Sequence, residues 1–287
     1  MYHEKDIVKN EWLINRLIET FLSYNIDAGL VTVEQYAAHS YTVLPDAVIA
    51  RMINPYISKQ LEDNNVRVFN SSKLSNICNN KAETMRLIHK LGIEHIPTIA
   101  VYDDEGKQAY EVIAHENMEV DLSNAHEYVI KSVTGHGGKE VFLLSDFLKD
   151  RPDYGEQEKN AASFYSDKYI IQPLINCNGR DMRVYIIGNE IIGAVLRQTE
   201  TGFKSNYSLG GHVSLYNLKD EQKNIIYSIL DNIDIDYGGI DFLVCGEEDR
   251  LVFNEIEDVV GARMLSECSD IDYVNIYVSY ILKELTK

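Results

Sequence analysis

Three carboxylates in the last part of the chain have the types and the spacing of a metal site. Glu255 and Glu257 lie two residues apart in a predicted strand, so they share one face while Asn254 and Ile256 share the other. Asp241 lies in another predicted strand. Carboxylates on one sheet face repel one another unless a cation joins them, and oxygen ligands suit Mg²⁺, which also binds phosphates. An exposed acidic strand edge is the alternative.

Two arginines precede this acidic group. Arg183 follows Asp181 by two residues, so both share one face of a strand, and Arg197 ends the next strand close to that face. A pair of arginines can hold phosphate or carboxylate oxygens through paired hydrogen bonds. Arg180 points the other way, towards a solvated partner. Asn206 lies in a polar loop, where it either supplies an amide near the substrate or belongs to a simple turn.

A lysine and a glycine-rich loop form a second candidate group. Lys131 ends an apolar strand, and a buried ammonium group needs an anion. Shortly after it come Gly135, His136, Gly137 and Gly138, whose backbone N–H groups can close on phosphate oxygens. We expect the His136 side chain to face solvent rather than to act in catalysis. A glycine hairpin beside a surface lysine is the alternative.

The segment after a further strand has the groups that an adenine ring needs. Gln172 can bind the exocyclic amine. Pro173 has no N–H, so the backbone donor comes from Leu174 or Ile175. An ordinary strand end explains these residues equally well.

The elements that position these residues fall into three segments. The first alternates strands and helices, which predicts a small parallel sheet, and the second is a mixed α+β unit. After residue 176 the pattern is antiparallel β, with a hairpin turn at Gly188-Asn189. Strands are predicted at 28–32, 47–51, 66–70, 98–102, 128–131, 140–144, 169–173, 183–187, 190–197, 239–244 and 251–256, and helices at 7–24, 55–64, 75–91, 219–233 and 271–285.

Composition narrows the classes of partner. With 45% hydrophobic and 25% charged residues, the 287 residues can form one to three ordinary domains. A formal charge of -18 argues against nucleic acid and against anionic membranes. No signal peptide and no apolar run near the roughly 20 residues of a membrane span is found, so we expect a cytoplasmic protein. Its 4 cysteines form no CxxC pair and are expected to be reduced thiols.

Taken in order, these motifs resemble those of the ATP-grasp carboxylate–amine ligases. The resemblance is greatest to the branch that holds the ribosomal-protein glutamate ligases and the amino-group-carrier ligases of lysine biosynthesis. It covers about residues 45–265. The matching blocks are a helix and strand at 67–98, the lid strand and glycine loop at 129–138, the hinge at 172–175, the substrate-side block at 179–211 and the metal block at 241–257.

The resemblance implies an ATP-grasp fold of the α/β (α+β) class, with the nucleotide between the last two of three domains. Residues 1–74 would form a truncated pre-ATP-grasp domain with a small parallel sheet. Residues 75–174 would form the central α+β lid domain. Residues 175–287 would form the carboxy-terminal antiparallel-sheet domain that carries catalysis.

The resemblance also implies roles for single residues. Lys81 and Lys131 would contact the ATP phosphates, with the 135–138 loop closing over them. Arg183 and Arg197 would hold the transferred phosphoryl group and the carboxylate. The other implied site residues are Gln172, Pro173, Leu174, Ile175 and Asp181 at the nucleotide, Asn206 at the catalytic centre, and Asp241, Glu255 and Glu257 on two Mg²⁺ ions, for which Mn²⁺ can substitute.

The implied reaction joins a carboxylate to an amine through an acyl phosphate, with release of ADP and phosphate. The substrates would be small molecules or peptides, and the assembly a homodimer or homotetramer. Two departures from the family are expected to matter. In the metal block, Glu257 stands where Asn is usual, and residues 258–263 differ from the usual small loop near the substrate. At the amino terminus, we expect the first strand and phosphate-facing turn of the usual domain to be missing. An ATP-binding module without ligase activity and an ATP-grasp small-molecule kinase are the alternatives.

Overall fold

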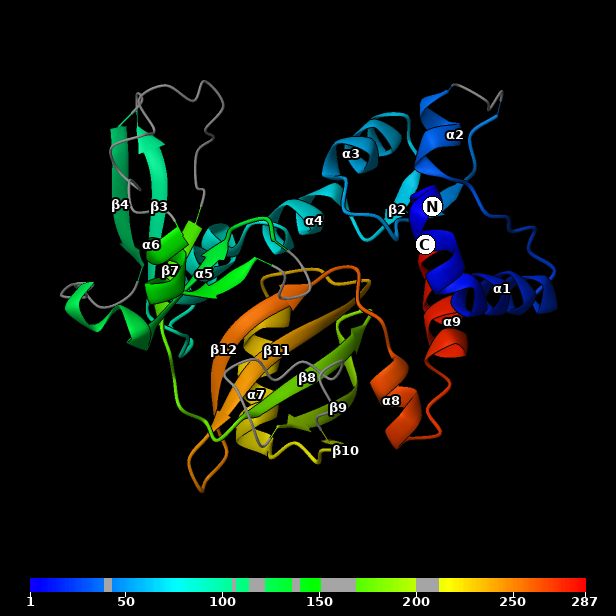
Figure 1. The fold of residues 1–287 in the computed structure, drawn as a ribbon. Coiled ribbons are helices and arrows are strands. Elements are labelled where there is room, and N and C mark those ends of the chain that lie inside the picture. The colour runs from blue at the N-terminus through cyan, green and yellow to red at the C-terminus, as the bar shows by residue number, and fades with distance from the viewer. Residues whose placement is uncertain (39–42, 105–106, 114–121, 136–139, 151–168, 200–211) are drawn as a thin grey trace.

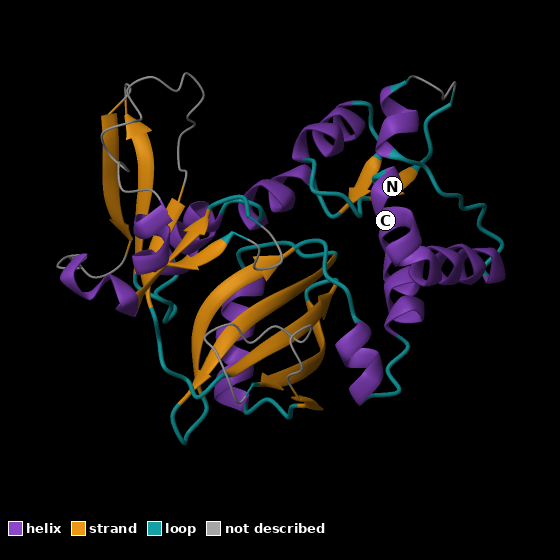
Figure 2. Cartoon of the chain, viewed as in Figure 1, coloured by secondary structure: helices purple, strands orange, loops and turns teal. Residues whose placement is uncertain are grey.

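The computed structural model describes residues 1–287 except 39–42, 105–106, 114–121, 136–139, 151–168 and 200–211. The described strands form a two-stranded parallel sheet and two five-stranded antiparallel sheets, mixed with helices (Figures 1 and 2). This arrangement confirms the predicted α/β (α+β) class. One sheet lies in each of the three predicted segments, whose boundaries stay a prediction.

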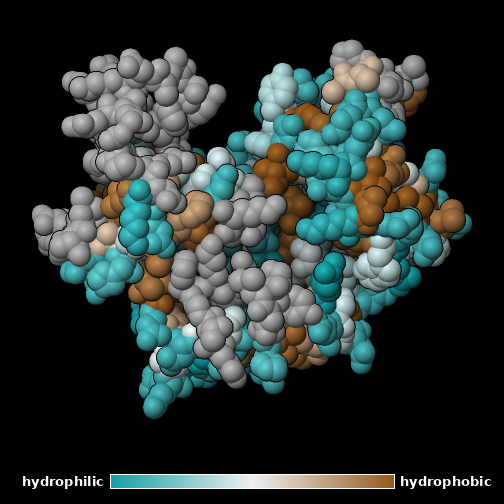
Figure 3. Space-filling view, in the orientation of Figure 1, coloured by the Kyte–Doolittle hydropathy of each residue, from teal (hydrophilic) through white to brown (hydrophobic). Residues whose placement is uncertain are grey.

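The amino-terminal unit is built on the parallel pair β1 (Ala47–Ile49) and β2 (Arg67–Phe69), as predicted. Its helices are α1 (Ile7–Ser23), α2 (Val33–Ala37) and α3 (Pro55–Asp63), preceded by the short η1 (Glu4–Asp6). The predicted strand at 28–32 is wrong, because only Thr32 forms a bridge, to Tyr2. Figure 3 shows hydrophobic surface over this unit, where α1 leaves Val8, Trp12 and Leu22 exposed.

The middle unit is a five-stranded sheet in the order β4-β3-β7-β5-β6. Every described pairing in it is antiparallel, and β7 lies between β3 and β5. The strands are β3 (Thr98–Asp104), β4 (Lys107–Ile113), β5 (Tyr128–Ser132), β6 (Val141–Leu143) and β7 (Tyr169–Pro173), and the helices are α4 (Ser72–Cys78), α5 (Lys81–Lys90), η2 (Leu122–Glu127) and α6 (Leu144–Asp150).

The single helix predicted at 75–91 is two helices, because Asn80 starts a new one. The Asn80 side chain accepts hydrogen bonds from the N–H groups of Ala82 and Glu83, at 3.1 and 3.2 Å, which caps α5. The Lys81 N–H, next in the chain, donates to Val133 O at 3.0 Å. The break therefore fixes the first residue of α5 beside the end of β5.

The carboxy-terminal unit is a sheet in the order β10-β9-β8-β11-β12, covered on one face by α7 (Figure 1). The predicted hairpin between β8 and β9 is confirmed, with positive φ at both Gly188 and Asn189. The elements are β8 (Arg180–Ile187), β9 (Glu190–Gln198), β10 (His212–Leu215), α7 (Asp220–Leu230), β11 (Tyr237–Cys245), β12 (Arg250–Glu257), α8 (Arg263–Cys268) and α9 (Tyr273–Leu285).

Contacts between the units fix their relative positions. The outer edge of β12 pairs with the segment before β3, where the Phe253 N–H donates to Glu94 O at 2.9 Å. Helix α9 packs against α1, so the two ends of the chain lie close together (Figure 1). Among the described residues, no helix combines the length and the apolar character that crossing a bilayer requires.

The expectation of four reduced thiols is wrong for one pair. Cys177 and Cys245 form a disulfide, although 68 residues separate them. The two cysteines meet because the segment before β8 passes the end of β11, where both are buried with Ile96 and Val252. Cys78 and Cys268 are free thiols.

Replacement of the α5 cap tests the helix break. Asn80→Ala removes both side-chain hydrogen bonds to the start of α5, so we expect the free energy of unfolding to fall by about 1 kcal/mol. Urea denaturation followed by circular dichroism measures this loss. The matched control is Asn76→Ala on the exposed side of α4, which should change it by less than about 0.5 kcal/mol. Equal effects of the two substitutions would contradict the capping role.

Candidate functional site

The candidate site forms on one face of the carboxy-terminal sheet, because the strand register places the charged residues opposite one another. Arg183 pairs with Asp241, Asp181 with Arg197, and Asp241 with Glu255. Side chains alternate along a strand, so all five project from the same face. The other face is apolar and packs against α7 with the residues Met182, Val184, Ile186, Ile240, Phe242 and Ile256.

A β-bulge in β12 turns its glutamates towards the site. Phe242 pairs with Phe253 whereas Asp241 pairs with Glu255, so Asn254 is an extra residue in β12. Phe253 therefore points into the core, where its ring centroid lies 5.9 Å from that of Phe242. Strict alternation would place Phe253 and Glu255 on one face, and the bulge separates them.

Asp241 is the most buried carboxylate of the site and is held by both arginines. Arg183 donates from Nε and Nη2 to its two oxygens, at 2.7 Å each. Arg197 donates from Nη2 to Asp241 Oδ2 at 2.8 Å and also binds Asp181. Arg183 Nη2 lies 2.8 Å from Glu257 Oε1 as well. The predicted meeting of these residues on one face is confirmed.

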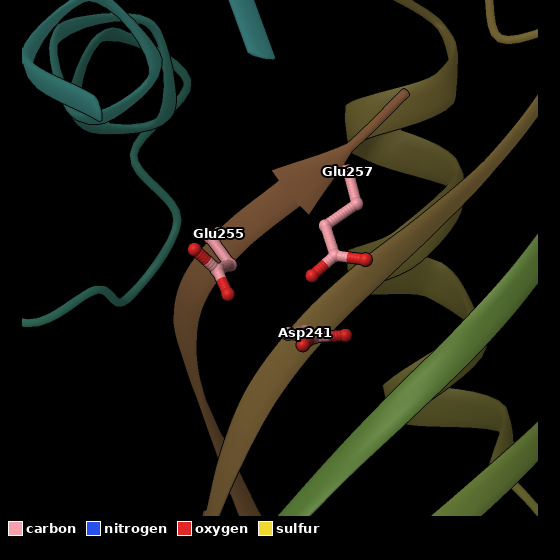
Figure 4. Close-up of side chains that lie close together, drawn as sticks. All are labelled: Asp241, Glu255 and Glu257. Carbon is pink, nitrogen blue, oxygen red and sulfur yellow. The ribbon is translucent and has the colours of Figure 1, made fainter. Parts of the chain in front are cut away.

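The three predicted metal ligands lie close together (Figure 4). Oxygens of Asp241, Glu255 and Glu257 lie within 4.8 Å of one another, and the three side chains converge between β11 and β12. Three carboxylate oxygens at this spacing form a donor set that suits a hard cation such as Mg²⁺. The residues present therefore fit a divalent metal.

Two lysines reach this acidic group from the middle unit. Lys131 Nζ, at the end of β5, lies 3.4 Å from Asn254 Oδ1, next in the chain to Glu255. Lys81 Nζ, at the start of α5, donates to Gly135 O at the beginning of the glycine loop. The prediction that Asn254 faces away from the site is wrong, because the bulge turns its amide towards Lys131.

Burial lowers the pKa of one site residue, and neighbouring charges lower the pKa of another. Burial lowers the pKa of Lys131 to about 8, although Glu255 opposes this shift. Burial alone would raise the pKa of Asp241, but Arg183 and Arg197 together lower it to about 2. Asp241 therefore stays ionised at neutral pH, while Lys131 titrates about one pH unit above neutrality.

The surroundings of Glu257 disfavour its ionised form. Burial raises its pKa from the ordinary value to about 7, with Asp241 and Glu255 adding to the shift and Arg183 opposing it. Glu257 consequently holds a proton over much of the neutral range when no cation is bound. A divalent ion must displace that proton before all three carboxylates can bind it.

The predicted adenine segment is partly engaged within the protein. Gln172 is fully buried and donates from Nε2 to Thr98 Oγ1 at 2.8 Å, while its Oε1 has no partner among the described residues. The Leu174 N–H donates to Glu127 O at 2.7 Å, which leaves Ile175 as the predicted backbone donor. Pro173 ends β7, the strand that pairs with β5 and leads into the hinge segment.

Other predicted positions lie apart from the group or outside the described residues. Arg180 turns away, as predicted, and binds Asp249 at 2.7 Å. His136, Gly137, Gly138 and Asn206 fall outside the described residues. Two residues that contact the site were not identified from the sequence: Asn254, which lies beside Lys131, and Thr98, which accepts a hydrogen bond from Gln172. One sign of the bulge is visible in the sequence: Phe253 and Ile256 are both apolar but three residues apart, whereas residues on one face of a regular strand are an even number apart.

Comparisons with known proteins agree with this geometry. The model of the RimK-like ATP-grasp domain matches residues 78–281. The chain is 27% identical over 285 residues to glutamate–LysW ligase of Sulfolobus acidocaldarius, covering 96% of this chain and 95% of that protein. It is 25% identical over 279 residues to human beta-citrylglutamate synthase B, covering 91% and 68%.

Two further matches extend the comparison. An uncharacterized protein of Mycoplasma genitalium is 30% identical over 161 residues, which cover 55% of this chain and 53% of that protein. A solved structure of the ATP-grasp ligase PsnB with a precursor variant, Mg and ADP has a TM-score of 0.64 and 14% identity, covering 96% of this chain and 95% of that one. The last likeness is one of fold.

The raised pKa of Glu257 predicts that Mg²⁺ affinity depends on pH. Because the metal competes with the Glu257 proton, affinity should rise about tenfold per pH unit below the pKa of about 7 and level off above it. Calorimetric titration between pH 5.5 and 7.5 measures this. Glu257→Asn should bind Mg²⁺ with little pH dependence, while Glu221→Gln on exposed α7 should behave as wild type. A flat wild-type profile would contradict the assignment.

Proposed function

This chain belongs to the RimK-like ATP-grasp family, and from that membership we propose that it is an ATP-dependent carboxylate–amine ligase. The reaction forms an acyl phosphate from a carboxylate and the γ-phosphoryl group of ATP, and the amine then displaces phosphate. The observation that carries the proposal is the meeting of Lys131 with the acidic group of Asp241, Glu255 and Glu257 at one site.

The charges of the site suit a nucleotide with two divalent ions. Four carboxylates and four cations meet here, so their formal charges cancel: Asp181, Asp241, Glu255, Glu257, Arg183, Arg197, Lys81 and Lys131. ATP carries a charge of about -4, which two Mg²⁺ ions offset. We therefore include two ions in the proposal, with Mn²⁺ as a substitute.

The cations of the chain perform the electrostatic part of the reaction. Attack of a carboxylate on a phosphoryl group brings two anions together, so neutralisation and positioning supply most of the acceleration. Lys81 and Lys131 bind phosphate oxygens from the side of the middle unit. Arg183 and Arg197 bind the carboxylate and the transferred phosphoryl group from the sheet. When bound, Mg²⁺ neutralises charge on the phosphate oxygens.

Water must be excluded, since an acyl phosphate hydrolyses readily. Gly135 begins the glycine loop, and Lys81 binds its carbonyl oxygen, so the loop and a phosphate-binding cation are linked. Closure of this loop over the nucleotide would protect the intermediate.

The amine substrate is proposed to be an acidic amino acid. Two relatives carry glutamate in their names, the glutamate–LysW ligase and the beta-citrylglutamate synthase, and they cover 96% and 91% of this chain. The carboxylate partner is proposed to be a small molecule or a peptide. A screen of ADP release with Mg²⁺, L-glutamate and a panel of carboxylic acids and dipeptides tests both choices.

Removal of the lid lysine tests the proposed function. Lys131→Ala deletes a cation next to Glu255, so turnover measured as ADP release should fall by at least about 10²–10³-fold. Circular dichroism and the melting temperature should stay near wild type, because truncation relieves a buried charge. The control is Lys149→Ala on exposed α6, which should keep full activity. Near-normal turnover of Lys131→Ala would remove the phosphate assignment.

A further inference from the structure

Asn254 is a residue of the site to which the proposed reaction gives no role. It is the extra residue of the bulge in β12, so Asn254 and Glu255 together lie opposite the single residue Asp241 of β11. Asn254 is half-buried, and Lys131 Nζ donates to its Oδ1 at 3.4 Å. The amide therefore lies where the lysine of the middle unit meets the metal-binding carboxylates of the sheet.

The contact with Lys131 fixes which way the Asn254 amide is turned. An ammonium group only donates hydrogen bonds, whereas an amide has one accepting oxygen and one donating nitrogen. Oδ1 must therefore face the lysine. Within the described part of the chain this oxygen is the one hydrogen-bond acceptor of Lys131 Nζ. The position of the ammonium group consequently depends on the Asn254 side chain.

Lys131 stays apart from the nearest metal ligand, although the two charges attract each other. It forms no ion pair with any carboxylate of the described residues. Glu255 nevertheless opposes the lowering of the Lys131 pKa, and it is next in the chain to Asn254. Because a lysine ammonium group ends a flexible stem, it is free to turn towards Glu255 unless another acceptor holds it. Asn254 supplies that acceptor.

The second lysine of the site is held in the same way. Lys81 Nζ donates to the carbonyl oxygen of Gly135, although the charges of Glu255 and Glu257 also act on it. Both proposed phosphate-binding lysines thus contact neutral oxygens rather than the carboxylates of the metal site. A neutral acceptor leaves the charge of the ammonium group to a phosphate, whereas an ion pair would offset that charge and occupy a carboxylate that the metal needs.

We propose that Asn254 is a positioning residue, whose amide holds the Lys131 ammonium group at the phosphate site and keeps it away from Glu255. The inference rests on the proposed ligase function and deepens it. The bulge in β12 then has two effects, because it turns Glu255 towards the metal and places a neutral acceptor beside that ligand. Asn254 acts on the nucleotide through Lys131, so its effect requires that lysine.

Removal of the amide tests the positioning role. Asn254→Leu keeps the approximate size of the side chain and deletes the acceptor, so the Kd of the full chain for ATP with Mg²⁺, measured by calorimetry, should rise about tenfold. The Kd for Mg²⁺ alone should rise about two- to fivefold, because Lys131 then pairs with Glu255. Thermal unfolding checks that each variant is folded. The matched control, Asn224→Leu on exposed α7, should leave both Kd values unchanged.

A double-mutant cycle separates positioning from a structural role. In a Lys131→Met background no ammonium group is left to hold, so Asn254→Leu should change the Kd for ATP by less than about twofold. A residue that only maintains the bulge would weaken ATP binding by the same factor in both backgrounds, and that result overturns the proposal. Unchanged ATP affinity of Asn254→Leu with Lys131 present overturns it too.

Asn254→Asp separates a neutral acceptor from any acceptor. The carboxylate keeps an oxygen for Lys131 but offsets its charge, so the Kd for ATP should again rise about tenfold. Wild-type ATP affinity of this variant would overturn the proposal. These outcomes concern ATP binding alone, so a failure leaves the ligase function intact. Binding that shows the expected dependence on Lys131, without ADP release for any carboxylic acid, would instead contradict the ligase function.

Discussion

The ion pairs between Asp241 and the two arginines of the sheet are the interaction on which the site depends. Asp241 is 1% exposed, and burial alone would favour its neutral form. Arg183 and Arg197 keep it ionised through three hydrogen bonds of 2.7–2.8 Å. Loss of one partner from such a buried group costs about 3–5 kcal/mol, so the charges must be retained together. Because both arginines are bound to Asp241, they compensate Glu257 less, and its pKa is raised to about 7. A bound metal ion would therefore displace a proton from Glu257.

The fold brings opposite charges to this face from separate units. The carboxy-terminal sheet supplies the carboxylates and arginines, and the middle unit supplies Lys81 and Lys131. The Asn80 cap fixes the start of α5, and pairing of the β12 edge with residues 94–96 holds the middle unit against the sheet. A nucleotide held between the two units would therefore meet cations on both sides. This arrangement suits the attack of a carboxylate on a phosphoryl group in the proposed reaction.

Much of this site could be predicted from residue spacing, since period two places Asp181 with Arg183 and Glu255 with Glu257. The hairpin at Gly188-Asn189 follows from residues that tolerate positive φ. The bulge could not be predicted by the same rule, because an extra residue reverses the parity that the rule assumes, and Asn254 was therefore placed on the wrong face. The break at Asn80 was missed because the apolar periodicity continues across it. The disulfide joins cysteines that only the folded chain brings together.

The most direct test of the account is a crystal structure of the protein with a non-hydrolysable ATP analogue and Mn²⁺, whose anomalous scattering locates the metal. The account predicts anomalous peaks between the oxygens of Asp241, Glu255 and Glu257, with the triphosphate in contact with Lys81 and Lys131. A nucleotide bound elsewhere, or a triphosphate with no metal between it and these carboxylates, would contradict it.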